Sequence, residues 1–265
     1  MNTVNPYWIG ARLVLQRLRW DLHPAAWSSR RALRRLRGTH AGEKAVILCN
    51  GPSLLQADFG ALARTGVFTF GLNKINLLFE TNPYRPSCVV AVNPHVIEQN
   101  RAFFNETGLP LFLDAGARGR VAARRGVVFL HSTRWPSFAE DCSASIFQGY
   151  TVTYVAMQLA FHLGFAAVAL VGCDHNFAQQ GKPNEAVVAG SSDPSHFHPG
   201  YFSGGVTWNL PDLRSSEFYY ALALDRYAEA GRTLVNCTAG GRLELLPRRT
   251  LAEFLQEGVP AAGRG

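Results

Sequence analysis

Short apolar runs, bounded by turn residues and separated by helical stretches, make up most of the chain from residue 44 onward. The strands that this pattern predicts cover residues 45–49, 67–71, 88–92 and 167–171, with weaker candidates at 111–113, 127–130 and 233–236. Apolar residues at helical spacing predict helices over 151–163 and 216–230, each followed by a glycine that suits a helix C-terminus. Alternating strands and helices are typical of βαβ units. We therefore expect a single α/β domain, a Rossmann-like fold with a mostly parallel sheet and helices on both faces.

The first 43 residues have a different pattern, in which aromatic and aliphatic residues alternate with arginines. The whole formal excess of +7 lies in residues 1–44, which hold nine basic and two acidic residues. We expect a basic amphipathic N-terminal helix here. This helix either anchors the chain at an anionic membrane surface through residues 1–40 or packs on the domain, and the sequence leaves both alternatives open. No apolar run in it approaches the roughly 20 residues that a membrane-spanning helix needs.

The change of pattern sets the expected boundaries. These are a basic segment at 1–43, the Rossmann-like domain at 44–255 and a flexible tail at 256–265, in which residues 260–265 are expected to be frayed. Because the charge outside the basic segment is balanced, we expect no nucleic-acid-binding face. Five scattered cysteines without a Cys-x-x-Cys pair are typical of reduced thiols in the cytoplasm. The expected location is therefore cytoplasmic, and peripheral on the inner membrane face if the anchor holds.

Polar residues directly follow four of the predicted strands. They are Asn50, Gly51, Pro52 and Ser53 after the first strand, Asn73 after the second, Asn93 after the third, and Asp174, His175 and Asn176 after the strand at 167–171. In a parallel sheet these positions meet at one edge, where ligands bind. Glycine allows a phosphate to approach the backbone closely, and asparagine amides bind phosphate, ribose or base. Each asparagine alone is equally well a turn former, but the set together predicts a nucleotide pocket.

Several familiar nucleotide-binding signatures are missing from these turns. Gly51 is followed by neither the Walker spacing nor Gly-x-Gly-x-x-Gly, which disfavours Walker-type ATPases and ordinary NAD enzymes. Asp174 has no acidic neighbour that would complete an Asp-x-Asp metal pair. No metal site is therefore assigned.

Residues 191–202 form a polar segment rich in glycine, proline and histidine, which we interpret as an active-site loop. A histidine here can act as a general base at neutral pH, and Tyr201, Phe202 and Trp208 offer flat apolar surfaces to a sugar ring. Two alternatives stay open, namely an ordinary loop histidine and a zinc ligand set of two histidines with Asp193.

These motifs occur in the same order in bacterial sialyltransferases of glycosyltransferase family 42, which the chain resembles over about residues 45–245. The motifs are Ile47-Leu48-Cys49-Asn50-Gly51-Pro52-Ser53-Leu54, Leu72-Asn73, Val92-Asn93-Pro94, Leu163-Gly164-Phe165, Gly172-Cys173-Asp174 and Ser195-His196-Phe197. The chain is more similar still to the domain-of-unknown-function 115 group. That group includes the central domain of motility-associated factor proteins, linked to nonulosonate addition on flagellin, and archaeal 6-hydroxymethylpterin pyrophosphokinases.

The sialyltransferase resemblance implies a GT-A-variant fold and a metal-independent, inverting transferase that uses a CMP-activated nonulosonic acid. It implies that Asn50, Asn73 and Asn93 hold the nucleotide and donor, that Asp174 contacts the cytidine and that His196 deprotonates the acceptor. His198, Tyr201 and Trp208 are assigned to the substrate. Thr151 and Thr153 stand where the family has a Ser-Gly pair, so only the hydroxyl function is kept. The family's phosphate-binding tyrosines have no counterpart, and Lys182, His175 or Asn176 are the candidates to replace them.

Three functions fit these residues. The first is a glycosyltransferase, whose nucleotide-binding transferase domain covers residues 44–255. Its acceptor is a bacterial surface glycan, a lipid-linked acceptor or flagellin. It needs no cofactor beyond a nucleotide-sugar donor. The second is a pterin pyrophosphokinase that uses ATP and Mg²⁺, with Asp174, Asp193 and Glu185 as metal candidates. The third is a non-catalytic nucleotide-binding component of a glycan assembly complex. An oligomer is compatible with all three.

Overall fold

The computed structural model describes residues 5–177 and 181–258. The tail predicted to be frayed at residues 260–265 lies outside the described residues. Within them, no helix is both long and apolar enough to cross a membrane.

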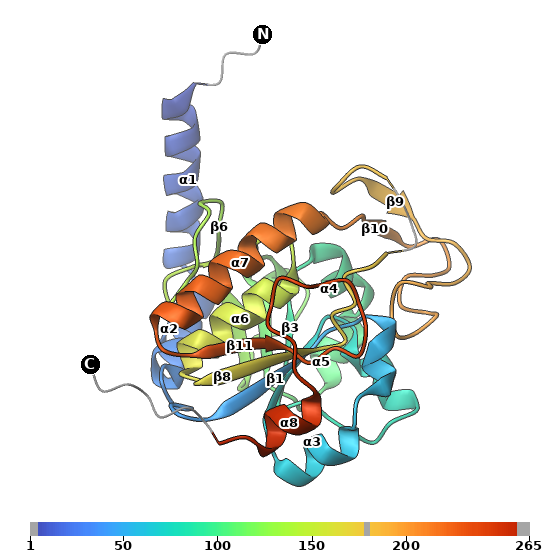
Figure 1. The fold of residues 1–265 in the computed structure, drawn as a ribbon. Coiled ribbons are helices and arrows are strands. Elements are labelled where there is room, and N and C mark those ends of the chain that lie inside the picture. The colour runs from blue at the N-terminus through green and yellow to red at the C-terminus, as the bar shows by residue number, and fades with distance from the viewer. Residues whose placement is uncertain (1–4, 178–180, 259–265) are drawn as a thin grey trace.

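A seven-stranded, all-parallel sheet forms the centre of the domain, as the sequence predicts, in the order β11-β8-β1-β2-β3-β4-β5 (Figure 1). Its strands are β1 (Lys44–Leu48), β2 (Phe68–Leu72), β3 (Cys88–Ala91), β4 (Leu111–Asp114), β5 (Val127–Leu130), β8 (Ala167–Val171) and β11 (Thr233–Asn236). The sheet is buried on both faces, so its strands are mainly apolar. Consecutive strand residues face opposite sides of the sheet. In β1, Ala45 and Ile47 join one hydrophobic cluster, whereas Val46 and Leu48 join the other. The expected α/β fold class is therefore confirmed.

Two long helices cover one face of the sheet. They are α6 (Val152–Leu163) and α7 (Leu213–Glu229). Buried residues of both helices belong to the cluster that contains Ala45 and Ile47. α6 is the central helix, because every residue from Thr153 to Leu163 is buried.

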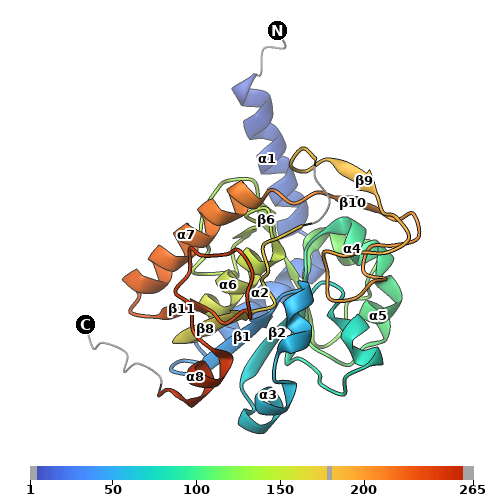
Figure 2. The same cartoon turned by 45° about the vertical axis from the view of Figure 1, so that its right-hand side comes forward.

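Shorter helices cover the opposite face (Figure 2). They are η1 (Pro52–Gln56), α3 (Phe59–Thr65), η2 (Ile75–Glu80), α4 (Pro94–Gln99), α5 (Arg101–Glu106), η3 (Ala115–Gly119) and α8 (Leu251–Gln256). In the order of the sheet, β2 to β5 follow β1 on one side, whereas β8 and β11 lie on its other side. The strand order therefore changes direction between β1 and β8, and open parallel sheets bind ligands at such a position.

Four very short strands lie outside the central sheet, and the sequence analysis predicts none of them. β6 (Ser132–Thr133) pairs with β7 (Ile146–Phe147), and β9 (Ala186–Val188) pairs with β10 (Thr207–Asn209). The β9–β10 hairpin adjoins the segment predicted to be an active-site loop.

Two helices replace the single N-terminal helix that the sequence predicts. α1 (Pro6–Asp21) ends near Leu22, and α2 (Pro24–Leu36) begins immediately afterward with His23 as its N-cap. A proline is readily accepted in the first turn of a helix but not in its interior, so Pro24 separates the two. α2 packs beside β5 and buries Leu33, whereas α1 projects away from the domain (Figure 1). Packing on the domain thus applies to α2 and to the last turn of α1, where Trp20 is buried.

Two glycines that end helices test the packing of the end of α6 against residues 38–41. Gly164 follows α6 with φ +99°, and a Cβ there would lie 2.9 Å from the Cα of Gly38. Gly231 follows α7 with φ +65° and has nothing within 4 Å of such a Cβ. Gly231→Ala should therefore lower the free energy of unfolding by about 1–2 kcal/mol, the cost of a left-handed alanine, and Gly164→Ala by clearly more. Urea denaturation measures both values, and equal losses would contradict the packing of α6 against residues 38–41.

Candidate functional site

The loops after β1 and β8 touch at the centre of the carboxyl edge. The N–H of Gly51 donates to the carbonyl oxygen of Gly172 at 2.9 Å. Oδ2 of Asp174 accepts from the Ser53 hydroxyl at 2.7 Å and from the Ser53 N–H at 3.2 Å. A Cβ on Gly51 would lie 1.9 Å from the same Oδ2, so only glycine fits. Pro52 then begins η1 without leaving an N–H unpaired.

Two predicted ligands beside this junction have buried amide oxygens without a partner. Oδ1 of Asn50 and Oδ1 of Asn73 accept no hydrogen bond from any described residue. Asn73 adopts a left-handed conformation with φ +51°, which asparagine tolerates better than most residues. A buried polar atom without a partner carries a desolvation cost, so these two side chains favour a polar ligand.

The remaining asparagine and the two threonines have structural partners. Oδ1 of Asn93 caps α4 by accepting from the N–H of His95 at 2.8 Å. Thr151 caps α6, and the Thr153 hydroxyl lies 3.7 Å from Sγ of Cys49. For the Asn93 oxygen, the turn-forming alternative therefore describes the structure better than a ligand contact.

His196 forms a buried dyad with Asp193. Nδ1 of the imidazole donates to Oδ2 of Asp193 at 2.7 Å, and no described residue forms a hydrogen bond with Nε2. The backbone N–H groups of Ser195 and Phe202 also donate to this carboxylate. Burial acts to raise the pKa of Asp193, but the hydrogen bonds and charge of His196 and the two N–H groups outweigh it, so the pKa is lowered. The carboxylate thus fixes the imidazole through Nδ1 and leaves Nε2 available for chemistry.

The loop that carries this dyad is fastened to the strand ends at two points. The N–H of Phe197 donates to the carbonyl oxygen of Asn50 at 2.9 Å. The buried ammonium of Lys74, which directly follows Asn73, donates to the carbonyl oxygen of Tyr201 at 2.6 Å and lies over the Phe202 ring. Burial lowers the pKa of Lys74 to about 8, and the Asp193 carboxylate opposes part of that shift. Lys74 has no role in the sequence analysis, because a lone lysine after a strand gives no signal.

Two of the rings assigned to the substrate lie inside the loop instead. Tyr201 is 1% exposed and stacks on His196 at 4.1 Å, and Trp208 is 6% exposed and stacks on Phe202. Their faces are occupied by these neighbours, so they support His196 and do not form an open sugar platform. The Tyr201 hydroxyl is buried and has no hydrogen bond of normal geometry within the described chain. Burial raises the pKa of this hydroxyl, and hydrogen bonding from Lys74 and the adjacent Asn73 side chain opposes part of that rise.

The candidates to replace the phosphate-binding tyrosines are not gathered at one point. His175 has φ +52°, and its Nε2 lies 3.0 Å from the Glu217 carboxylate. Asn176 is exposed, and Lys182 is exposed on the turn before β9. The predicted substrate residue His198 lies 3.4 Å from the Glu80 carboxylate, away from the dyad's free nitrogen.

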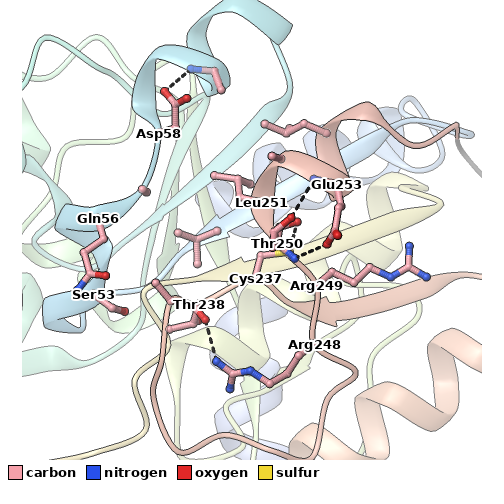
Figure 3. A pocket seen from close by; sticks show the side chains of 16 residues that line it. Ser53, Gln56, Asp58, Cys237, Thr238, Arg248, Arg249, Thr250, Leu251 and Glu253 are labelled. Carbon is pink, nitrogen blue, oxygen red and sulfur yellow. Dashed lines mark hydrogen bonds between the residues drawn. The ribbon is translucent and has the colours of Figure 1, made fainter.

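A cavity of about 570 Å³ lies on the other side of η1, between η1 and α8 (Figure 3). Ser53 is the only predicted ligand among its lining residues. Arg248, Thr250 and Glu253 line the α8 side, and no sequence reasoning had assigned any of them to a site. The Thr250–Glu253 capping box is nevertheless visible in the sequence as a Thr-x-x-Glu pattern.

The polar groups on the α8 side of this cavity are already paired. Arg248 donates to the carbonyl oxygens of Thr238 and Gly240, and Arg249 forms an ion pair with Glu257. Thr250 and Glu253 satisfy one another at the start of α8. In the strand-end cluster, in contrast, buried oxygens of Asn50, Asn73 and Tyr201 have no hydrogen-bond partner among the described residues. We therefore place the candidate site at the strand ends and not in this cavity.

The three metal candidates of the pyrophosphokinase alternative do not meet. Among residues 5–177 and 181–258, no three His, Cys, Asp or Glu side chains form a group that could hold a metal ion. The Asp193 carboxylate accepts three hydrogen bonds, and Asp174 is bound by Ser53. Glu185 accepts from the backbone of Lys182 near β9.

Comparison with known proteins adds information on the fold. The chain is similar to the structure of a Maf glycosyltransferase from Magnetospirillum magneticum AMB-1, with a TM-score of 0.52 and 17% sequence identity. The match covers 86% of this chain and 38% of that one, so this chain spans well under half of the longer protein. No family model and no curated protein matches the sequence. The similarity supports the glycosyltransferase-like fold, and none of the comparisons bears on the sialyltransferase or domain-of-unknown-function 115 resemblance.

The buried ammonium of Lys74 predicts a particular pH dependence of stability. Its folded-state pKa of about 8 lies below the value near 10.4 of an unfolded lysine. Between these values the unfolded chain binds more protons, so the penalty of the buried charge is complete below pH 8 and disappears as the pH rises. The free energy of unfolding of the wild type, relative to Lys74→Met, should therefore rise between pH 8 and about pH 10. Urea denaturation across this range tests the effect, and a constant difference would show that Lys74 is not desolvated.

Proposed function

We propose that this chain is a glycosyltransferase that moves a sugar from a nucleotide donor to an acceptor hydroxyl, with His196 as general base. The observation that supports it is that two buried polar atoms without partners lie beside a histidine that can act as a base. Oδ1 of Asn50 and of Asn73 have no partner among the described residues, and the loop bearing His196 is hydrogen-bonded to the backbone of Asn50 itself. The fold similarity to a Maf glycosyltransferase is consistent with this proposal.

The proposed chemistry uses Nε2 of His196. This nitrogen takes the proton of the acceptor hydroxyl as the oxygen attacks the anomeric carbon. The bond from that carbon to the phosphate oxygen breaks, and the nucleotide leaves with the electron pair. Asp193 stabilises the imidazolium through Nδ1–H. Attack opposite the leaving group inverts the anomeric centre, and the motif resemblance makes a CMP-linked, sialic acid-like nonulosonate the proposed donor.

The residues present favour this reaction over pyrophosphoryl transfer. An ATP and Mg²⁺ mechanism needs oxygen ligands that converge on the metal. Asp174, Asp193 and Glu185 are instead each engaged by different partners. A His–Asp dyad with one free nitrogen is the arrangement that a general base requires.

His196→Ala tests the proposed reaction. Loss of a general base should reduce transfer from a CMP-linked nonulosonate about 10²–10⁴-fold, while CMP still raises the melting temperature as in the wild type. His95→Ala, which removes an exposed histidine at the start of α4, is the matched control and should keep full activity.

Three outcomes would decide against the proposed function. Stabilisation by ATP with Mg²⁺ but by no CMP compound would favour the pyrophosphokinase. Nucleotide binding without any reaction in the wild type would favour the non-catalytic component. Equal activity of His196→Ala and the wild type would remove His196 as the base.

We also propose that α1 holds the protein at an anionic membrane, near a glycan or lipid-linked acceptor. Tyr7 is 85% and Trp8 76% exposed, and Val14, Leu15 and Leu18 on the same side are exposed as well. This side is flanked by arginines, a combination that suits the interface between headgroups and acyl chains. Exposure of so many apolar side chains is costly in water, which supports the anchor alternative for α1.

Vesicle binding tests the anchor. The double variant Trp8→Glu/Leu15→Glu should lose sedimentation with phosphatidylcholine vesicles that contain phosphatidylglycerol, because two charges then enter the apolar side of α1. Gln16→Glu, a single charge change elsewhere on the same helix, is the control and should retain most of the binding. Undiminished binding of the double variant would contradict a role for this side.

A further inference from the structure

A second group of unpaired polar atoms lies at the far end of the carboxyl edge, well apart from His196. It is formed where the α1–α2 corner meets the chain after β4 and β5. Its members are Trp20, Arg30, Arg118 and His131, and we call them the corner cluster. They come from α1, α2, η3 and the residue after β5.

Ring contacts and hydrogen bonds connect these side chains to one another. The Arg118 guanidinium lies 5.0 Å from the centre of the Trp20 ring, and that ring stacks on His131 at 5.9 Å. The Ser145 hydroxyl accepts from Arg17 at 2.8 Å and lies 2.8 Å from Nδ1 of His131. Arg17 and Arg30 both pair with Asp21.

Each member of the corner cluster has one buried nitrogen without a partner among the described residues. These nitrogens are Nε1 of Trp20, Nε of Arg30, an Nη of Arg118 and Nε2 of His131. The first three can only donate, and the imidazole nitrogen donates when it carries a proton. Trp20 is only 3% exposed, so its indole N–H is poorly hydrated and is stabilised by any acceptor bound beside it. Unpaired donors with no acceptor among them require an external acceptor.

The local charge points to the same kind of ligand. Three guanidiniums, those of Arg17, Arg30 and Arg118, act together on His131. Burial and these positive charges lower the pKa of His131 to about 4. Asp21 is shared by Arg17 and Arg30, and the Asp114 carboxylate acts on Arg118, so two carboxylates compensate three guanidiniums only in part. The Arg17 and Arg30 side chains are 36% and 20% exposed, which connects the corner cluster to the surface.

We propose that the corner cluster binds an oxyanion of the phosphate class, a ligand independent of the proposed transferase reaction. Phosphate oxygens accept from several N–H groups at once, and guanidinium donors match their geometry. Two sources can supply this group. One is a free phosphate ion, and the other is the phosphomonoester headgroup of an acidic lipid, because α1 leads from the corner cluster to the proposed membrane side.

Inorganic phosphate is the probe for the site itself. Phosphate should raise the melting temperature of the full chain above that in chloride at equal ionic strength. Arg118→Gln and Trp20→Phe should each lose most of this rise, since one removes a guanidinium and the other removes the indole N–H together with the five-membered ring that carries it. Arg101→Gln removes an exposed arginine on α5 and should keep the rise. Trp20→Phe keeps an aromatic ring in place, so it remains informative if Arg118→Gln folds poorly.

Two results would overturn the proposal. One is the absence of a phosphate-specific rise in the wild type, and the other is an equal rise in Trp20→Phe, Arg118→Gln and Arg101→Gln. Vesicles of phosphatidylcholine with phosphatidic acid then distinguish the sources. Weaker sedimentation of Trp20→Phe and Arg118→Gln than of Arg101→Gln identifies the lipid headgroup. If all three variants sediment equally, while Trp20→Phe and Arg118→Gln still lose the rise of the melting temperature in phosphate, the ligand is the free ion. This result also supports the proposed site.

Discussion

The contact between Gly51 and the Asp174 side chain is the constraint on which the candidate site depends. The loops after β1 and β8 come together here because the β1 loop has no side chain at the point of contact, Gly51. Ser53 then binds the Asp174 carboxylate through both its hydroxyl and its N–H. The positions of Asn50 and of the His196 loop, which is bonded to the Asn50 carbonyl, follow from this contact.

The His196 loop is ordered by side chains that the sequence places close together but does not connect. Asp193 holds the imidazole from one side, and the Tyr201 ring supports it from beneath. Lys74 crosses from the end of β2 to bind the Tyr201 carbonyl, at the expense of burying its charge. The position of Nε2 of His196 therefore depends on Lys74 at the end of β2 and on Asp193 and Tyr201 in the loop.

The fold could be predicted well because burial on both faces gives each central strand a continuous apolar run. The strand ends could be predicted for the same reason, since Asn50, Asn73 and Asp174 directly follow such runs. The break at Pro24 was visible in the sequence but was not used. The roles of Lys74 and Tyr201 could not be predicted, because they depend on a contact between residues more than 100 positions apart. The corner cluster, drawn from four separate elements, has no local signal at all.

The central claim is that a nucleotide binds at the carboxyl ends of β1, β2 and β8, beneath the His196 loop. A crystal structure of the protein with CMP tests this claim most directly. The account predicts density for the nucleotide against the side chains of Asn50 and Asn73, with Nε2 of His196 facing the phosphate side. Density in the cavity lined by Arg248 and Thr250, with both asparagine oxygens still unpaired, would contradict it.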